Sequence, residues 1–437
     1  MFSDEQLDDL KLRSIEVLKL NRHKKFTKPS SKLYPHQWNW DSAFIAIGLS
    51  HIDEELAQQE ILSLLSGQWG NGMIPHIVYS DSSANYLPDE NFWDSKKIKN
   101  SPKNISTSGI TQPPVLSFAA LKVCENSKDK NNSKKFLKEI YPKLISYQRF
   151  LNEDRNLTGD DLICVLHPWE SGLDNSPRWD KSLQNIQIKN YYRVNRVDDK
   201  FIPKHQRPTD KDYQLYFFIA EKLKEQDYKI KDYLSLPVVM QDVMFNALAI
   251  LSLESLITIS EFIEEDSSQL IYWKNKLSNA INTKLWDEKN KRFYDWDVIS
   301  NRAIDNLTLA NCIPLILNSL SQKQIDSIVS HLKKNGDFWK EDGFPLSAIP
   351  LSSPEFNPKN YWRGPVWINM NWLLIQGLEK HGFSELVTEL SNETIRLVLE
   401  SGFYEYFDPI IGEGCGSDNF SWTAALIIDL INKHQTK

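Results

Sequence analysis

Apolar residues recur at three- and four-residue steps along most of the chain, and this periodicity limits the possible folds more than any other feature. Met244, Leu248 and Leu251, for example, fall on one stripe of a helix. Glycine and proline occur mainly between such stretches, and β-branched or aromatic runs are few and short. The pattern predicts a mostly helical chain. The predicted helices cover residues 4–20, 42–50, 55–66, 114–125, 134–152, 211–225, 238–263, 268–285, 305–319, 322–334, 364–380, 384–400 and 420–433.

A recurring unit joins several of these helices. The helices that end near Leu151, Leu285 and Leu399 are each followed by a polar turn and a short apolar or aromatic strand. Recurrence of a unit along a helical chain is typical of a repeat architecture. We therefore predict an all-α fold, an (α/α)6 barrel, which is a closed toroid of helical hairpins. Short β-hairpins and loops are expected to gather at its funnel-like end, where sites tend to lie.

The chain is expected to fold as one domain across residues 1–437, because no Gly/Ser/Pro-rich linker divides it. The longest stretch without helical periodicity covers about residues 175–210. This stretch is too long for an ordinary connection. Its aromatic and arginine content, including Trp179, Tyr191 and Arg207, favours a lid-like loop region over disorder.

Charge and cysteine usage exclude several functional classes. The formal net charge is -7, which argues against binding to nucleic acid or an anionic membrane. The acidic start, residues 1–9, has no signal-peptide pattern, and no apolar stretch approaches the ~20 residues that span a bilayer. The four cysteines are scattered without a CxxC pair, which indicates free thiols in the cytoplasm. We expect no cofactor and no metal site, since metal-type clusters are missing from the sequence.

Carboxylates lie among tryptophans, glycines and prolines in several short clusters. Aromatic faces can stack on the apolar faces of a sugar ring, and carboxyl groups can transfer protons or activate water. The 14 tryptophans are the compositional outlier, and most of them lie close to Gly, Pro, Asp or Glu. The sequence therefore indicates a site that cleaves sugars. The clusters are residues 34–41, 167–177, 361–367, and 402–408 with 420–423.

Asp174 and Glu405 are the candidate catalytic carboxylates. Glycoside cleavage typically uses two carboxyl groups in different surroundings, one protonated and one ionised. Asp174 lies in a turn rich in Gly, Pro and Asn, although an aspartate there could equally cap the next helix. Glu405 alternates with aromatic residues. Two neighbours compete with them: Glu170 could bind sugar hydroxyls, and Asp408 could simply start a turn.

The other clusters supply candidate binding residues. Asp41 could bind hydroxyls between Trp38 and Trp40, or it could cap the helix that follows. Arg363 offers a fixed fork of donors to hydroxyls or a carboxylate, and Pro365 suits the first turn of a helix. The histidines near the clusters, which we interpret as hydrogen-bonded spacers, are His36, His76, His167 and His205.

Taken together, the clusters resemble glycoside hydrolase family 63. The resemblance extends over nearly the whole chain, and it is strongest to the bacterial-type branch that hydrolyses mannosylglycerate or glucosylglycerate. Leu87 departs from the pattern, which has an aromatic residue beside Tyr86, and this affects substrate fit but not the reaction class. The motifs are Tyr34-Pro-His-Gln-Trp-Asn-Trp-Asp41, Asn71-Gly-Met-Ile-Pro-His76, Thr111-Gln-Pro-Pro114, residues 167–179, Arg207-Pro-Thr-Asp210, Tyr361-Trp-Arg-Gly-Pro365 and Glu405-Tyr-Phe-Asp408.

The resemblance implies an (α/α)6 barrel and an α-glycosidase that inverts the anomeric configuration. It makes Asp174 the general acid and Glu405 the general base. Arg207 and Tyr213 would face the glycerate end, where an arginine suits a carboxylate. The residues expected to bind the substrate, from the clusters and the resemblance together, are Tyr34, Trp38, Trp40, Asp41, Tyr86, Gln112, Trp169, Glu170, Arg207, Tyr213, Tyr361, Trp362, Arg363, Gly364, Trp367 and Trp422.

The preferred function is hydrolysis of glucosylglycerate or mannosylglycerate to free hexose and glycerate in the cytoplasm. The expected partner is this small glycoside, without nucleic acid or membrane, and a homo-oligomer is compatible with the sequence. An α-glucosidase or trehalase-like hydrolase for another disaccharide or oligosaccharide is the main alternative. A sugar epimerase would require central histidines, which are few here, and a non-catalytic sugar-binding toroid would bind glycosides without turnover.

Overall fold

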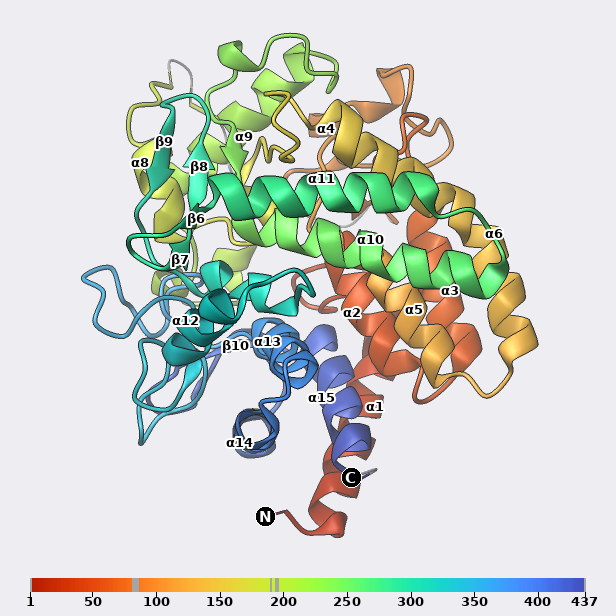
Figure 1. Ribbon diagram of the computed structural model, residues 1–437, viewed down its shortest axis with the longest axis vertical. Coiled ribbons are helices and arrows are strands. Elements are labelled where there is room, and N and C mark those ends of the chain that lie inside the picture. Colours follow the sequence, from red (N-terminus) through yellow and green to blue (C-terminus); the bar gives the residue numbers. More distant parts are fainter. Residues whose placement is uncertain (1, 81–85, 189–190, 193–195, 436–437) are drawn as a thin grey trace.

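The computed structural model describes residues 2–80, 86–188, 191–192 and 196–435, and helices make up most of it (Figure 1). Each predicted helical segment but one is an α-helix, which confirms the helical periodicity. These helices are α1 (Asp4–Asn21), α2 (Asn39–Leu49), α3 (Glu54–Leu65), α5 (Leu116–Asn126), α6 (Lys130–Arg149), α9 (Asp210–Glu225), α10 (Val243–Ile263), α11 (Ser268–Lys284), α12 (Gln322–Leu332), α13 (Ile368–Lys380), α14 (Ser384–Ser401) and α15 (Ser421–Gln435).

The exception is the segment 305–319, where a 3-10 helix, η7 (Leu309–Ile316), replaces the predicted α-helix. Pro314 lies inside η7, and proline has no amide hydrogen to donate to a longer α-helix. Three short α-helices were not predicted, because four residues are too few to show a periodicity. They are α4 (Glu90–Trp93), α7 (Pro168–Ser171) and α8 (Asp180–Leu183).

The helices form an inner ring surrounded by an outer layer. Along the ring, α2 packs against α5, α5 against α10, α10 against η7, η7 against α13, and α13 against α15, and α15 packs back against α2. The outer helices α3, α6, α11, α12, α14 and α1 each pack on one or two of these elements, as α11 does on α10 in Figure 1. The predicted toroid of helical hairpins is therefore confirmed. Helices α1 and α15 lie side by side, near both chain ends (Figure 1).

Inner helices are surrounded by other helices, so they are apolar on every side. Helix α10 shows the consequence most clearly. Among the described residues it is the one helix that is long and apolar enough, by length and composition, to cross a membrane, and 83% of its apolar window is buried inside the protein. The expectation that no apolar stretch approaches the bilayer-spanning length is thus wrong. Burial on all sides of an inner helix explains its composition.

Short antiparallel strands connect the helices. The strands predicted near residues 293–297 and 403–408 form, whereas residues 162–165 contribute only an isolated bridge between Val165 and Met240. The pairs are β1 (Arg22–His23) with β2 (Phe26–Thr27), β3 (Gln37–Trp38) with β4 (Ile77–Val78), β6 (Trp286–Asp287) with β7 (Arg292–Phe293), β10 (Tyr404–Phe407) with β11 (Gly414–Asp418), and the three-stranded sheet of β5 (Met240–Gln241), β8 (Asp295–Asp297) and β9 (Arg302–Ile304).

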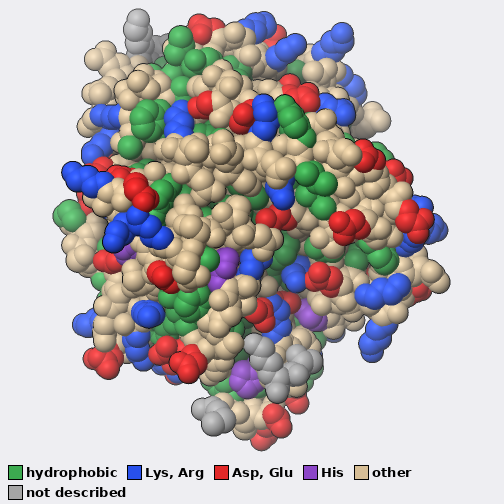
Figure 2. Space-filling view, in the orientation of Figure 1, with side chains coloured by type: hydrophobic (Ala, Val, Ile, Leu, Met, Phe, Trp, Pro, Cys, Tyr) green, Lys and Arg blue, Asp and Glu red, His purple; other side chains and the backbone are tan. Residues whose placement is uncertain are grey.

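Acidic and basic side chains are interspersed on the face that Figure 2 shows, without a continuous basic region. Opposite charges close together on a surface largely offset each other at a distance. This face therefore offers no strong field of one sign to a charged partner.

The ring closes where α2 crosses α15, and a glycine makes this crossing possible. A Cβ atom on Gly48 of α2 would lie 2.4 Å from the Cα atom of Ala425 in α15. Real carbon atoms in contact lie more than 3 Å apart, so any side chain at position 48 would push the two helices away from each other.

Replacing Gly48 by alanine should lower the free energy of unfolding by ~1–3 kcal/mol, because the backbone of α15 must move to admit the methyl group. Urea unfolding followed by tryptophan fluorescence measures the change. Gly70→Ala is the matched control, since its added Cβ would meet nothing closer than 3.4 Å. Equal stability of the two variants would show that the ring does not depend on this close approach.

Candidate active site

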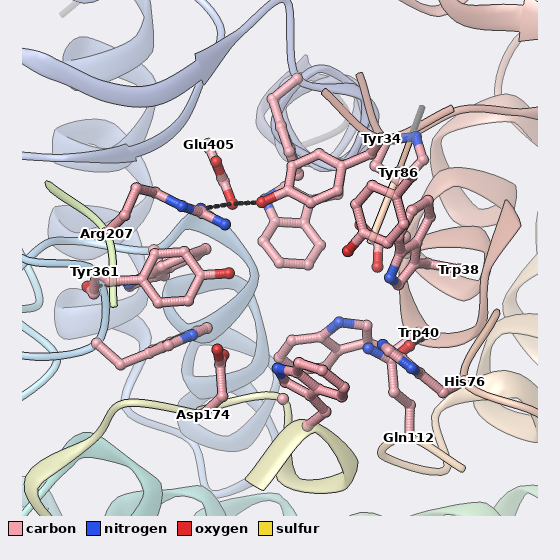
Figure 3. Close-up of a pocket in the computed structure, with 18 of the residues that line it drawn as sticks. Tyr34, Trp38, Trp40, His76, Tyr86, Gln112, Asp174, Arg207, Tyr361 and Glu405 are labelled. Atoms are coloured by element: carbon pink, nitrogen blue, oxygen red, sulfur yellow. Dashed lines mark hydrogen bonds and ion pairs between the residues drawn. The ribbon is translucent and has the colours of Figure 1, made fainter. Parts of the chain in front are cut away.

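The predicted site residues converge on one pocket at the end of the ring where inner helices begin. Its walls come largely from the segments just before α2, α5, α13 and α15 and from the first turns of α2 and α15 (Figure 3). The pocket holds about 680 Å³ of empty space, including the solvent at its mouth. The predicted residues that line it are Tyr34, Trp38, Trp40, Asp41, Tyr86, Gln112, Trp169, Asp174, Arg207, Tyr213, Tyr361, Trp362, Trp367, Glu405 and Trp422.

Glu170 is a predicted binding residue that does not reach the pocket. It is fully buried, and its carboxylate accepts hydrogen bonds from Arg155 Nη2 at 2.6 Å and Nη1 at 2.8 Å. The backbone amides of Thr111 (3.2 Å) and Leu166 (2.8 Å) also donate to it. Its oxygens are therefore occupied by the protein, and the prediction that it contacts sugar is wrong. It ties the segment before α5 to the segment that leads into α7.

Arg363 and Gly364 also lie outside the pocket lining, so their role as binding residues stays a prediction. The Nη1 atom of Arg363 is 3.0 Å from Asp180 Oδ2 in a partly exposed ion pair. A Cβ atom on Gly364 would lie 2.2 Å from the carbonyl oxygen of Asn357. Both residues shape the loop before α13, which places Trp362 in the pocket.

Several lining residues were not predicted as site residues. Gly172 ends α7 with a φ of 74°, and a Cβ there would come within 2.7 Å of the Trp40 ring. A glycine that ends a short helix just before a candidate carboxylate is a signal that could have found it. Phe420 could have been found from its place beside Trp422 at the start of a helix. The lining residues in question are Pro29, His76, Leu87, Pro88, Gly172 and Phe420.

Asp174 is held by its backbone, and its carboxyl group faces the pocket (Figure 3). It does not cap a helix, because the N-cap of the next helix is Ser176. The Tyr216 hydroxyl donates to the Asp174 carbonyl oxygen at 2.9 Å. Burial raises the pKa of the Asp174 carboxyl to about 7, although the positive charge of Arg207 opposes the rise. Asp174 can therefore carry a proton near neutral pH.

Glu405 lies on β10 and is surrounded by donors. Its Oε1 atom accepts from the Tyr34 hydroxyl at 2.7 Å and from Arg207 Nη1 at 3.3 Å. Its Oε2 atom accepts from the Ser417 amide at 3.1 Å. Donors and a guanidinium stabilise a negative charge on a carboxylate. Asp174 faces the same space from the opposite side (Figure 3), so the pocket holds two carboxyl groups in unlike surroundings.

Asp41 is a third carboxyl group of the pocket. It lies in the first turn of α2, whose N-cap is Trp38, so the alternative that Asp41 caps this helix is wrong. Burial, followed by the charge of Glu405, raises the pKa of Asp41 well above its usual value. By contrast, Asp408 accepts from the Ile410 amide at 2.8 Å, as predicted for a residue that starts a turn.

Aromatic rings form much of the remaining wall. Trp362 stacks on Trp367 with a centroid distance of 3.8 Å and an interplanar angle of 5°. Trp40 meets Trp422 edge-on, with centroids 5.4 Å apart. Flat indole faces beside carboxyl groups suit a ligand with both apolar C–H faces and hydroxyl groups, as a pyranose ring has.

His76 contributes an uncharged imidazole to the pocket. Burial, helped by the nearby His167, lowers the pKa of His76 to about 3. Its ring stacks on Trp169 at an interplanar angle of 22°. Within the described part of the chain, no hydrogen-bond partner meets its buried Nδ1 atom. From the sequence alone we interpret His76 as a hydrogen-bonded spacer. Its place at the end of the motif Asn71-Gly-Met-Ile-Pro-His76 is the signal that could have identified it as a pocket residue.

Arg207 enters the pocket from the predicted lid-like region. Within residues 175–210 the structure contains η3 (Pro177–Trp179), α8, η4 (Asp198–Lys200) and η5 (Lys204–Gln206), while residues 189–190 and 193–195 of this prediction lie outside the described residues. The Tyr406 hydroxyl donates to the Gln206 carbonyl oxygen at 2.6 Å, and the Gly416 amide donates to its side chain at 3.1 Å. These bonds fix the end of the region, and with it Arg207, to the β10–β11 hairpin.

The arrangement is suited to proton transfer at a glycosidic bond. One carboxyl group can hold a proton near neutral pH, and the other is stabilised as an anion, which is the pairing that glycoside cleavage requires. Among residues 2–80, 86–188, 191–192 and 196–435, no group of three or more His, Cys, Asp or Glu side chains is placed to hold a metal ion.

Known proteins with similar sequences and structures are glycoside hydrolases. Residues 34–423 match the family described as the mannosylglycerate hydrolase MGH1-like glycoside hydrolase domain. A mannosylglycerate hydrolase from Rubrobacter radiotolerans is 34% identical over 432 residues, which cover 98% of this chain and 97% of that protein. A glucosylglycerate hydrolase from Mycolicibacterium hassiacum is 33% identical over 437 residues, which cover 96% and 97%.

Among solved structures, the family 63 mannosylglycerate hydrolase of Thermus thermophilus, crystallised with Tris and D-glycerate, superposes with a TM-score of 0.89. The two sequences are 34% identical, and the match covers 96% of this chain and 99% of that chain. The likeness therefore extends over the whole toroid and its pocket-forming segments.

The buried pair of Glu170 and Arg155 gives a stability prediction. Replacing Glu170 by glutamine should lower the free energy of unfolding by ~3–5 kcal/mol, because Arg155 keeps a buried charge without its counter-charge. Urea unfolding measures the loss. Glu264→Gln, which breaks an exposed pair with Lys134, serves as the control and should leave the unfolding midpoint unchanged. Similar midpoints for both variants would contradict a structural role for Glu170.

Proposed function

The chain belongs to the mannosylglycerate hydrolase MGH1-like glycoside hydrolase family, and we propose that it hydrolyses an α-glycoside of glycerate with inversion at the anomeric carbon. The substrate is glucosylglycerate or mannosylglycerate, and the products are the free hexose and glycerate. The observation that carries the proposal is a pair of carboxyl groups that face each other across the pocket. Burial raises the pKa of Asp174 to about 7. Glu405, on the other side, accepts hydrogen bonds from Tyr34 and Arg207.

In this mechanism the two carboxyl groups act on opposite sides of the anomeric carbon. Asp174 gives its proton to the glycosidic oxygen as the bond from that oxygen to the anomeric carbon breaks. Glu405 takes a proton from a water molecule, whose oxygen forms the new bond to the anomeric carbon. The proton from Asp174 leaves with glycerate, and the water oxygen becomes the hydroxyl group of the hexose.

The pocket walls divide between the two halves of the substrate. The indole faces of Trp40, Trp362 and Trp422 are placed to hold the hexose. Among the described residues that line the pocket, Arg207 is the one lysine or arginine, and it is placed to bind the glycerate carboxylate. The names of the relatives support both glucose and mannose as the hexose.

A substrate panel tests the proposal. Glucosylglycerate and mannosylglycerate are compared with the corresponding glycerol glycosides, which lack only the carboxylate, and with trehalose. We expect turnover of a glycerate glycoside and, by proton NMR at early times, release of the β-hexose. Preferred turnover of trehalose or of a glycerol glycoside would instead support the α-glucosidase or trehalase-like alternative, and early release of the α-hexose would exclude inversion.

Substrates with different leaving groups can distinguish the role of Asp174 from that of Glu405. Asp174→Ala should lower kcat on the glycerate glycoside by about 10²–10⁴-fold, as expected for loss of a general acid. The same variant should still hydrolyse the matching glycosyl fluoride whose anomeric configuration the enzyme accepts, because fluoride leaves without a proton. Glu405→Gln should lose both activities. An Asp174→Ala variant that is equally impaired on both substrates would argue against the acid role.

The pH dependence follows from the raised pKa of Asp174. The general acid must be protonated, and it is protonated below its pKa, so activity should be lost as pH rises through about 7. A profile of kcat/KM from pH 5 to 9 measures the alkaline limb. Activity that stays constant to pH 9 would contradict the assignment.

We also propose that the enzyme acts in the cytoplasm. All four cysteines, Cys124, Cys164, Cys312 and Cys415, are buried and unpaired, which suits a reducing compartment. Cell fractionation with an antibody against the chain would test this location. Recovery with secreted proteins would refute it.

A further inference from the structure

Asp198 is a buried carboxylate directly behind the part of the pocket where Arg207 and Tyr213 lie. It is 6% exposed, and it lines a small side chamber that shares Arg207 and Tyr213 with the main pocket. The Arg207 Nε atom and the Tyr213 hydroxyl both donate to Asp198 Oδ2, each at 3.2 Å. One carboxylate oxygen therefore links two residues that line the pocket.

Arg196 completes this group and fixes Asp198 in place. Its Nη2 atom lies 2.8 Å from Asp198 Oδ2, and its Nε atom lies 3.1 Å from Oδ1. The guanidinium stacks over the Tyr213 ring at 4.6 Å and bonds Asp210 at the start of α9 at 3.0 Å. Burial would raise the pKa of Asp198, but Arg196 and Arg207 outweigh burial and lower it to about 2. The carboxylate is thus ionised at neutral pH.

Several contacts fix the orientation of the Arg207 guanidinium in the pocket. Nε is bonded to Asp198, Nη1 is bonded to Glu405, and the plane stacks over the Tyr361 ring at 4.4 Å. The Tyr406 side chain also hydrogen-bonds with this guanidinium. Among the described residues, Nη2 is the guanidinium nitrogen that bonds neither Asp198 nor Glu405. Because Tyr213 uses its hydroxyl hydrogen on Asp198, its oxygen is left as an acceptor for a ligand hydroxyl.

We propose that Asp198 is a positioning residue that sets the preference for an anionic aglycone. It orients Arg207 to bind the aglycone carboxylate through Nη2, and it orients the Tyr213 oxygen to accept an aglycone hydroxyl. This inference rests on the proposed function, because it concerns the glycerate half of the substrate. It predicts that loss of Asp198 impairs binding of glycerate glycosides more than binding of their neutral analogues.

The neighbouring Asp199 offers a matched control. It also pairs with Arg196, at 3.2 Å, and with Lys204, at 3.3 Å. No contact joins it to Arg207 or Tyr213 among the bonds and ion pairs of the described residues. Asp199→Asn therefore removes the same charge one position away, at a residue that bonds neither Arg207 nor Tyr213 directly.

The experiment compares Asp198→Asn, Asp199→Asn and the wild type on a glycerate glycoside and on the glycerol glycoside of the same hexose. Asp198→Asn should raise KM for the glycerate glycoside about ten- to a hundredfold, in line with the effect of small misplacements of a binding group. Its kcat/KM should fall about tenfold less on the glycerol glycoside than on the glycerate glycoside, and any change in kcat that Arg207 transmits to Glu405 should be the same on both substrates. Asp199→Asn should resemble the wild type on both substrates. Thermal unfolding confirms that each variant is folded.

Two further variants keep the test decisive. Asp198→Glu preserves the charge but moves the carboxylate by one methylene, so it should also raise KM for the glycerate glycoside, and it covers the case in which Asp198→Asn does not fold. Tyr213→Phe removes one of the donors to Asp198, so its effect and that of Asp198→Asn should be less than additive in the double variant.

The outcomes separate this inference from the proposed function. A wild type that does not hydrolyse glycerate glycosides overturns both. A wild type that does so, combined with Asp198 variants that match Asp199→Asn, overturns the role of Asp198 alone. Equal losses on the charged and neutral substrates would likewise overturn it, because they would indicate a general structural effect.

Discussion

Closure of the inner ring between α2 and α15 is the constraint on which the pocket depends. These two helices are almost at opposite ends of the chain, and Gly48 lets them approach until their backbones nearly touch. The contact brings the segment before α2 beside the segment before α15. As a result the Tyr34 hydroxyl reaches Glu405 at 2.7 Å. Without the closure, the candidate base would lose a donor and the pocket would lose a wall.

The positions of the site residues along their elements follow from the same ring. Asp41 and Trp422 lie in the first turns of inner helices, and Trp367 is the N-cap of α13. Helix N-termini carry a partial positive charge and unpaired amide groups. They therefore give the apolar barrel one polar end. At this end, carboxyl groups and sugar hydroxyls can be buried at a lower cost in free energy than in the apolar core.

Buried ion pairs hold the pocket loops onto this frame. The pair of Glu170 and Arg155, through the amides that Glu170 also accepts, joins the segment before α5 to the segment that leads into α7. Arg178, four residues after the candidate acid, is fully buried and pairs with Asp242, the N-cap of α10, and with Asp295 of β8. Such pairs add little net stability, but losing one partner is costly. They suit a site in which a carboxyl group must stay in one orientation, so stability and catalysis draw on the same residues.

The sequence by itself determined the helices, the aromatic-carboxylate clusters and most pocket residues, because periodicity and residue type are local properties. It could not show that the segment around Pro314 forms a 3-10 helix, or which of two nearby carboxylates faces the pocket. Glu170 and Asp174 are only four residues apart, yet α7 and the turn at Gly172 direct Glu170 to Arg155 and Asp174 to the pocket. Side-chain direction depends on the backbone path and on partners far along the chain. Only the tertiary structure therefore showed that Glu170 is turned away from the pocket toward Arg155 and that Asp198 lies behind Arg207.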